Sequence, residues 1–217
     1  MTETVMVFCA HSDDHILGPG ATLAKFSEEG KKIVTVIFSF GEKSHSHLKP
    51  KVIRKKRVQE AKNADKIIGG SEVLFLGLRE TKFLQDAEKL NLNSKLKQLI
   101  EKHSPSIIFT HTNDDKDIPS LDHPNVNKIV MSILDSINYK GRVYAFDVWN
   151  PFNFKNRFEP RQYFDVSKVF NKKLQALDCF ESQQIALSHL LISVYVKAVM
   201  YGFYNGCRYA ERFYILK

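Results

Sequence analysis

Short apolar runs alternate along this chain with longer segments in which apolar residues recur every three or four positions. Continuous runs are typical of strands buried on both faces, and the longer spacing is typical of amphipathic helices. The predicted strands are Val5–Cys9, Ile33–Phe38, Val73–Leu76, Ile107–Phe109 and Arg142–Val148. The predicted helices are Gly18–Glu29, Val52–Ile68, Leu90–His103 and Asn125–Asn138. This alternation predicts an α/β, Rossmann-like fold in which helices flank a mostly parallel sheet.

The pattern changes after Pro151. Asn150–Tyr163 is rich in Asn, Phe, Pro and Arg and predicts a long loop over a site. The spacing then predicts helices over Ser167–Gln184 and His189–Gly202, and a closing strand over Arg208–Leu216. The 217 residues contain no repeat or interdomain linker, so we expect a single domain over residues 1–217.

The most apolar stretch, Ala186–Tyr204, is interrupted by two Ser, a His and Lys197. A membrane-spanning helix needs about 20 largely uninterrupted apolar residues, so we expect a buried helix and no stable membrane insertion. The N-terminus carries Glu3 where a secretory signal would have basic residues. We therefore expect a cytoplasmic protein.

Three cysteines, Cys9, Cys179 and Cys207, are widely spaced and form no CxxC pair. Their odd number and spacing are evidence against a disulfide scaffold and against a thiolate zinc site. They favour a reducing compartment.

The chain has 32 Lys and Arg against 24 Asp and Glu, a net charge of +8 that raises the possibility of a nucleic-acid partner. It shows no helix-turn-helix, RRM aromatic set or C₂H₂ spacing, so we expect no nucleic-acid binding. Six of the 32 cations lie in Lys49–Arg57, which contains no acid. This basic segment is either a solvated helix face or an attractive surface for an anionic substrate, such as a nucleotide- or lipid-linked sugar phosphate.

Polar residues gather where the predicted strands end. His11–His15 follows the first strand, Gly41–Pro50 the second and His111–Pro124 the fourth. Ligands of open parallel sheets bind at the carboxyl ends of the strands. We therefore expect an active site at this edge of the sheet.

The segment after the first strand offers metal ligands. A strand-to-helix turn lets side chains three positions apart converge, as His11 and Asp14 are. Imidazole and carboxylate suit a divalent metal of the zinc type, and Asp13 between them can face a bound water. The alternative is that both acids cap a helix N-terminus.

The segment after the fourth strand can complete the site. His123 can supply a third ligand, and Asp122 can orient one of the imidazoles. Pro124 is expected to begin a helix. The alternative of a calcium loop lacks support because the EF-hand Gly and terminal Glu are missing.

Taken together, these motifs resemble the LmbE-like, or PIG-L, family of zinc-dependent N-deacetylases. Ala10-His11-Ser12-Asp13-Asp14 through Gly18 is similar to the first family motif, and Ser120-Leu121-Asp122-His123 to the second. Weaker similarity covers nearly the whole chain, at residues 20–24, 57–61, 75–78, 165–167 and 209–213.

The resemblance implies that His11, Asp14 and His123 bind Zn²⁺, although another divalent transition metal is possible. It also implies that Asp13 is the general base for a metal-activated water that attacks an acetamide carbonyl. The implied partner is a small-molecule N-acetylated sugar or conjugate.

Three residues depart from the family pattern. Ser12 replaces a Pro, and His15 stands where the family usually has Glu. Ser120 replaces a His thought to polarise the amide carbonyl, and loss of such a donor can cost about 10²–10³ in rate. His111, near the start of the same segment, is a candidate substitute.

Arg57 and Glu60 match a family pair, which is either a salt bridge on one helix face or, through Arg57, a contact with substrate. Glu211 matches a further family position, and we expect it to be structural or to support the ligands. Further residues that are candidates either for a substrate mouth or for packing and surface positions are His45, His47, Trp149 and Phe152.

The leading functional hypothesis is a metal-dependent deacetylase of an N-acetylglucosamine-type amide. The alternatives are an amidase for another small amide, such as a thiol conjugate, and a catalytically weakened small-molecule-binding member of the family. The sequence does not determine the oligomeric state.

Overall fold

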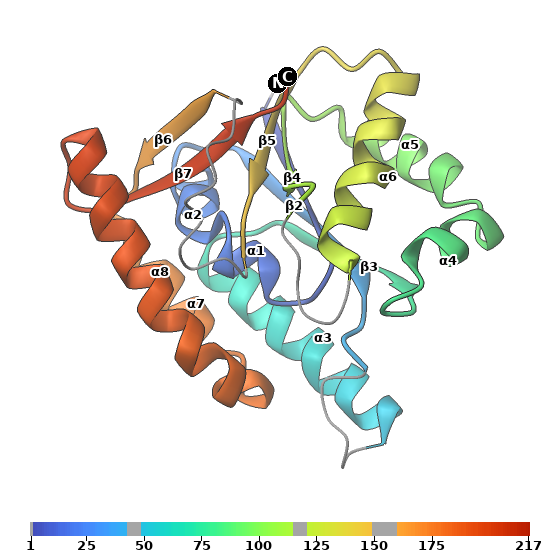
Figure 1. Cartoon of the computed structure of the whole chain (residues 1–217), viewed down its shortest axis with the longest axis horizontal. Coiled ribbons are helices and arrows are strands. Elements are labelled where there is room, and N and C mark those ends of the chain that lie inside the picture. The colour runs from blue at the N-terminus through green and yellow to red at the C-terminus, as the bar shows by residue number, and fades with distance from the viewer. Residues whose placement is uncertain (1, 43–48, 115–120, 149–159) are drawn as a thin grey trace.

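A computed structural model describes residues 2–42, 49–114, 121–148 and 160–217. These residues form a seven-stranded sheet with the order β3-β2-β1-β4-β5-β7-β6 (Figure 1). The strands are β1 (Thr4–Cys9), β2 (Lys32–Ser39), β3 (Glu72–Leu78), β4 (Ile107–His111), β5 (Arg142–Phe146), β6 (Arg161–Asp165) and β7 (Ala210–Ile215). β1 to β5 are parallel, and β7 runs antiparallel to both β5 and β6. The prediction of an α/β, mostly parallel sheet is confirmed.

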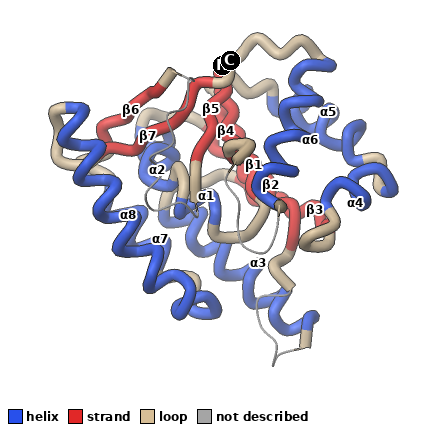
Figure 2. Tube along the Cα trace, viewed as in Figure 1, coloured by secondary structure: helices blue, strands red, loops and turns tan. Residues whose placement is uncertain are grey.

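Helices cover both faces of this sheet (Figure 2). One face packs against α1 (Asp14–Leu17), α2 (Gly20–Glu28), α3 (Pro50–Ile67), α7 (Phe170–Leu177) and α8 (Gln184–Asn205). The other packs against α4 (Phe83–Lys89), α5 (Leu92–His103) and α6 (Asp122–Ser136). Alternate residues of β1 point to opposite faces, so Val5 and Val7 join the first core and Met6 and Phe8 the second. This two-sided burial explains why the predicted strands are continuously apolar.

Some predicted boundaries are wrong. The helix predicted over Gly18–Glu29 is α2, which begins two residues later, after Pro19, and the short helix α1 that precedes it was not predicted. Pro19 has no N–H to continue α1 into α2. The helix predicted over Ser167–Gln184 is shorter, because α7 is followed by a 3₁₀ turn, Glu181–Gln183.

Residues 161–163, predicted as loop, belong to β6. Among the described strands, β6 pairs only with β7, and it lacks the long apolar run of a central strand. Residues 150–159 of the predicted loop lie outside the described part of the chain.

α8 confirms a predicted helix, but the expectation that its apolar residues are buried is wrong. Its segment Leu187–Asn205 has a mean hydropathy of 1.2 and meets the length and composition of a membrane-crossing helix, although such a match by one helix is weak evidence. Only 28% of that window is buried. One side of α8 packs on the sheet through Leu190, Ala198 and Tyr201, and the opposite side is exposed.

The strand order reverses at β1, because the chain builds β2 and β3 on one side of it and β4 and β5 on the other. Such a switch point is where ligands of open α/β sheets bind. His11–Asp14 follows β1, and His111 ends β4. α6 begins at Asp122, two residues before the predicted Pro124, because a Pro is tolerated within the first helical turn. His123 therefore lies in that first turn, beside the loop after β1.

Candidate metal centre

The turn after β1 folds the Asp14 side chain back over the loop. The backbone N–H of His11 donates to Asp14 Oδ2 at 2.8 Å, and Asp13 O accepts the amides of Ile16 and Leu17. Asp13 precedes α1, but its side chain makes no capping hydrogen bond. This geometry does not support the alternative that Asp13 acts as a capping side chain.

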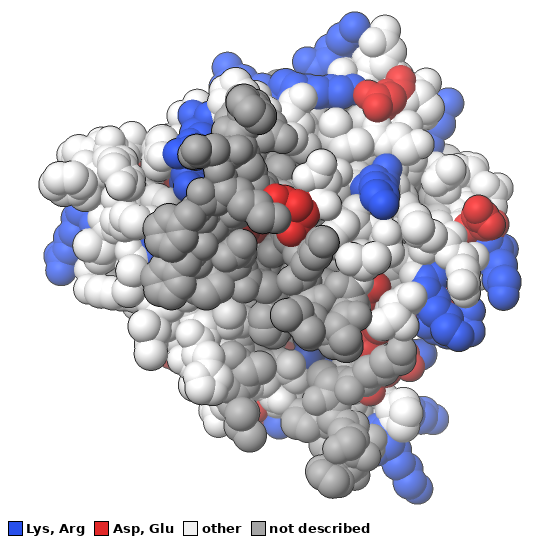
Figure 3. Space-filling view, in the orientation of Figure 1, with Lys and Arg blue, Asp and Glu red and all other residues white. Residues whose placement is uncertain are grey.

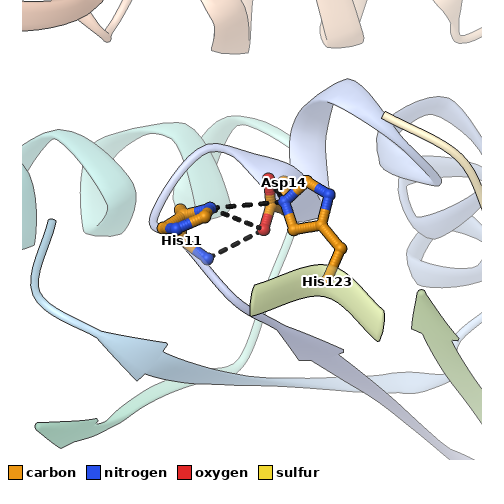
Figure 4. A group of neighbouring side chains, drawn as sticks. All are labelled: His11, Asp14 and His123. Carbon is orange, nitrogen blue, oxygen red and sulfur yellow. Dashed lines mark hydrogen bonds and ion pairs between the residues drawn. The ribbon is translucent and has the colours of Figure 1, made fainter. Parts of the chain in front are cut away.

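Three side chains from β1–α1 and α6 converge at the switch point (Figure 4). His11 Nδ1 lies 3.7 Å from Asp14 Oδ2 and 3.3 Å from His123 Nε2. His123 Nε2 lies 3.4 Å from Asp14 Oδ1. Donor atoms bound to one tetrahedral zinc lie roughly 3.3–3.5 Å apart. The group, whose ligand atoms all lie within 4.8 Å of one another, could therefore hold a metal ion.

Electrostatics at this group favours an ionised carboxylate. Burial raises the pKa of Asp14, but the imidazoles of His123 and His111 outweigh it and hold that pKa well below its usual value. Burial lowers the pKa of His11, but a hydrogen bond to Asp122 and the charge of Asp14 raise it to a net value above normal. One anionic oxygen and two imidazoles form a donor set typical of zinc and related transition metals.

Asp122 and His111 surround the three converging residues. Asp122 Oδ2 lies 3.5 Å from His11 Nε2, the nitrogen away from the cluster, and its carboxylate accepts the Thr81 N–H at 2.9 Å. His111 stacks on His123 with ring centroids 4.0 Å apart, and its Nε2 lies 3.1 Å from Asp14 Oδ2.

The same Nε2 of His111 accepts the Ala10 N–H at 3.1 Å, and the residue is fully buried. Asp122 and His111 are therefore both placed to orient the candidate ligands.

Asp13 lies at the more accessible side of the site, with 13% of its side chain exposed. Arg57, buried on α3, places Nη2 3.6 Å from Asp13 Oδ1 and donates from Nε to Ser12 Oγ at 2.9 Å. Glu60 instead accepts two hydrogen bonds from Ser182, at 2.8 and 2.6 Å. The structure thus pairs Arg57 with Asp13 rather than with Glu60.

Three of the six cations in the basic segment Lys49–Arg57 have acidic partners among the described residues. Besides Arg57, Arg54 pairs with Glu42, and Lys56 lies 3.4 Å from Glu181. Lys49, Lys51 and Lys55 are exposed. This arrangement favours the interpretation as a solvated helix face for most of the segment.

A cavity of about 250 Å³ opens at the carboxyl ends of β2 and β3. Its lining residues are Ser39, Phe40, Gly41, Glu42, Leu78, Arg79, Glu80 and Lys82. Gly41 of this cavity abuts Arg57, and Thr81, which follows the lining residue Glu80, donates its N–H to Asp122. The cavity is thus linked to two residues that flank the candidate metal site. Glu42 belongs to Gly41–Pro50, one of the polar segments expected at this edge of the sheet, whereas Arg79 and Glu80 were not predicted as site residues, although their position directly after a strand was a usable signal.

Several predicted candidates fall outside the part of the chain that the structure describes. These are Ser120, His45, His47, Trp149 and Phe152.

His15 does not join the metal group. It is fully buried beside α3, with Nε2 3.9 Å from Asp65 Oδ1. Burial lowers the pKa of His15 to about 4 and raises the pKa of Asp65 to about 7. Thr35 Oγ1 donates to the same Asp65 oxygen at 2.8 Å.

The raised pKa of Asp65 predicts that this residue makes a pH-dependent contribution to the free energy of unfolding. The folded protein keeps this carboxyl protonated up to about pH 7, whereas the unfolded chain ionises it near 3.8, so folding takes up a proton between these values. Its stabilising contribution is fully present below about pH 4 and is lost as pH rises through 7. Relative to wild type, we expect the free energy of unfolding of Asp65→Asn, measured with urea, to rise by about 2 kcal/mol as the pH is raised from 5 to 8.

The exposed Asp178→Asn on the same face of the sheet controls for the loss of one carboxylate. His15 makes the free energy of unfolding depend on pH in the opposite direction, between about pH 4 and 6.5. It is present in both proteins, so its contribution cancels in the difference between them. An Asp65→Asn difference that is constant with pH would contradict the assignment.

The fold and the converging side chains define a Rossmann-like α/β protein with a candidate metal centre at its switch point. The chain belongs to the PIG-L family, described as GlcNAc-PI de-N-acetylase, whose profile matches residues 6–134. This segment runs from β1 into α6 and contains His11, Asp14 and His123. The family resemblance seen in the sequence is confirmed.

Individual relatives differ in reaction. The chain is 26% identical over 200 residues to 4-oxalmesaconate hydratase of Pseudomonas putida, covering 84% of this chain and 74% of the relative. It is 23% identical over 223 aligned positions to diacetylchitobiose deacetylase of Thermococcus kodakarensis, covering 96% and 81%. The solved N,N'-diacetylchitobiose deacetylase of Pyrococcus horikoshii has the same fold, with a TM-score of 0.82, 19% identity and coverage of 99% and 84%. Family membership alone therefore does not select the reaction.

Proposed function

We propose that this protein is a zinc-dependent hydrolase that removes an acetyl group from an N-acetylglucosamine-type amide. The observation that carries the proposal is the His11–Asp14–His123 group with the partly exposed Asp13 beside it, in a chain of the PIG-L family. When bound there, a divalent metal would polarise the amide carbonyl and lower the pKa of water toward about 7.

The chain's own residues then divide the work. Asp13 takes a proton from the attacking water, whose oxygen bonds to the carbonyl carbon. As the C–N bond breaks, Asp13 returns the proton to the amine nitrogen, so the products are the free amine and acetic acid, which releases its proton to become acetate. Arg57, 3.6 Å from Asp13, orients this carboxylate. Asp122 orients His11, and buried His111 supports Asp14 and His123 rather than reaching the substrate.

The substrate is a small sugar or sugar conjugate in this proposal. The cavity at the ends of β2 and β3 offers charged groups, including Glu42, Glu80 and Lys82, together with the ring of Phe40. Carboxylates and ammonium groups bind sugar hydroxyls, and an aromatic ring packs on the apolar face of a pyranose. Its volume of about 250 Å³ lies just below the usual range of about 300–1,000 Å³ for ligand pockets and so suits a small ligand.

The proposed location is the cytoplasm. All three cysteines are unpaired, and Cys9 is buried beside the site, where burial raises the pKa of its thiol well above the usual value. Unpaired cysteines are compatible with a reducing compartment.

The function is tested by acetate release and metal content measured together. We expect about one zinc per chain, and acetate release from N-acetylglucosamine, diacetylchitobiose or an N-acetylated thiol or phospholipid conjugate. Asp14→Ala is expected to lower the bound metal at least tenfold and to abolish release. The exposed Asp178→Ala is the matched control and should change neither quantity.

The outcomes separate the alternatives. Metal binding without acetate release would contradict deacetylation and favour a binding protein or another reaction, such as the hydration carried out by one relative. Release confined to a thiol conjugate would identify the amidase alternative. Failure to bind zinc or any other divalent transition metal would contradict both the site and the function.

A further inference from the structure

The exposed side of α8 carries a continuous apolar stripe. Its residues recur at three- and four-residue intervals, and their exposed fractions run from 39% at Met200 to 84% at Phe203. The full stripe is Ile192, Tyr195, Val196, Val199, Met200, Phe203 and Tyr204. None of these seven positions is charged, and few charged atoms are visible over α8 in Figure 3. Contiguous exposed apolar surface of this kind marks an interaction site.

The stripe is separate from the side of α8 that packs in the hydrophobic core. The opposite side of α8 packs on the sheet through Leu187, Leu190, Ala198 and Tyr201. α8 lies at the outer flank of the molecule (Figure 1). Tyr195 packs against Phe170 and Tyr209 at one edge of the stripe, but the described elements leave every stripe residue at least 39% exposed. Within the described residues, this exposed apolar area therefore has no covering partner.

We propose that the α8 stripe binds a second copy of this chain, with the two α8 helices packed antiparallel about a two-fold axis. A stripe with a large residue at each end and smaller ones in the middle is complementary to its own rotated copy. Val196 and Val199 lie near the middle and allow close approach of the helices. Ile192 at one end meets the partner's Tyr204 at the other.

Area and composition fit this occupant. Aromatic side chains bury about 150–250 Å² each, so the stripe with its rim can supply much of the roughly 800 Å² that each partner contributes to a stable interface. Homodimer interfaces are enriched in Tyr, Phe and Met and depleted in charge at their centre, as this stripe is.

A membrane surface fits less well. Helices that lie in the membrane interface carry Lys and Arg along their polar face. The only Lys or Arg in α8 is Lys197, and it lines a cavity toward the sheet together with Arg212 and Glu211. The stripe thus lacks the basic border that anionic lipid would require.

The test is the mass in solution of the full chain by light scattering and sedimentation at micromolar concentration. We expect wild type to form a dimer of the 25.0 kDa chain, or a larger assembly built from such dimers. The double variant Val196→Glu, Phe203→Glu should raise the dissociation constant of the α8 contact by about 100-fold or more and halve the mass of the assembly in solution. Leu90→Glu, which places the same charge on an exposed apolar residue between α4 and α5, is the control and should not change the mass.

Each possible outcome either supports or overturns the proposed dimer. A monomeric wild type, an assembly that the double substitution leaves intact, or binding of a monomer to phosphatidylserine vesicles through the stripe would each overturn the proposal. Both changes are at exposed positions, and the circular dichroism of the variant shows whether the fold is kept. Should the double variant fail to fold, Val199→Cys in a Cys179→Ser, Cys207→Ser background provides a second test. Its position near the axis should give a disulfide-linked dimer on mild oxidation with copper and air, whereas Ile192→Cys should not.

Discussion

Replacing Asp13 by Asn is expected to lower kcat for acetate release by about 10²–10⁴-fold without changing the metal content. Asn keeps the shape of the side chain but cannot take the proton from water. Asp13 is not one of the three converging residues, and its 3.6 Å contact is with Arg57. Loss of rate with retained metal therefore separates proton transfer from metal binding.

The control for this prediction is Asp14→Asn, which changes the adjacent carboxylate in the same way. Asp14 lies between His11 and His123, so its variant should lose metal as well as rate. The measurements are steady-state kinetics and bound zinc for both variants. An Asp13→Asn protein with wild-type kcat, or one that has lost its zinc, would contradict the role given to Asp13.

The central sheet could be predicted because the strands covered on both faces are almost continuously apolar. Met6 and Val7 of β1 lie on opposite faces, and each meets a helical layer. β6 lacks this signal, since it lies at the sheet edge and its apolar pair Tyr163 and Phe164 is too short to count as a buried run. α4 was not predicted because it is also short, with only seven residues. It is followed almost directly by α5, and the two helices are separated at Asn91, which has a positive φ of 48°.

α8 illustrates a different limit. Its apolar residues occur on all sides of the helix, so periodicity alone cannot tell which side the sheet covers. The covered side is decided by Ala198 and Tyr201 meeting the β7 region, a contact that local sequence does not encode.

The convergence of His11, Asp14 and His123 followed from two local facts and one general rule. His11 and Asp14 share a strand-to-helix turn, His123 begins the helix after β4, and β1 and β4 are neighbours at the switch point. The contact of Arg57 with Asp13 could not be derived in this way. It depends on the angle at which α3 crosses the sheet and on Gly41, whose lack of a side chain leaves room for the guanidinium.

A buried ion pair holds the segment that carries the site. Lys173 Nζ of α7 donates to Glu211 Oε1 of β7 at 2.6 Å, and both side chains are at most 7% exposed. Lys173 also donates to the carbonyls of Leu17 and Gly18 at the end of α1, each at 2.8 Å.

Glu211 acts on the other helix of this segment. Its carboxylate accepts the amides of Ala21 and Thr22 at the start of α2, at 3.2 and 2.7 Å. The cation thus lies at a helix C-terminus and the anion at a helix N-terminus, as the helix dipoles favour. Together they fix the break between α1 and α2, directly after Asp13 and Asp14.

Lys173→Met is expected to reduce the free energy of unfolding by about 3–5 kcal/mol, because it leaves Glu211 buried without its cation. Lys172, the preceding residue, supplies a matched control. It pairs with Glu28 at 2.8 Å, but both side chains are at least 41% exposed, so Lys172→Met should cost less than about 1 kcal/mol. The measurement is guanidinium unfolding of both variants at one pH.

The double variant Lys173→Met, Glu211→Gln completes the test. Removing both charges leaves no uncompensated ion in the core, so the double variant should be more stable than Lys173→Met alone even though it has lost one more native group. This comparison also remains informative if Lys173→Met is too unstable to measure, since the double variant should then recover a cooperative transition. Equal costs for Lys172→Met and Lys173→Met would show that the buried pair does not hold the α1–α2 break, and the geometry of Asp13 and Asp14 would need another source.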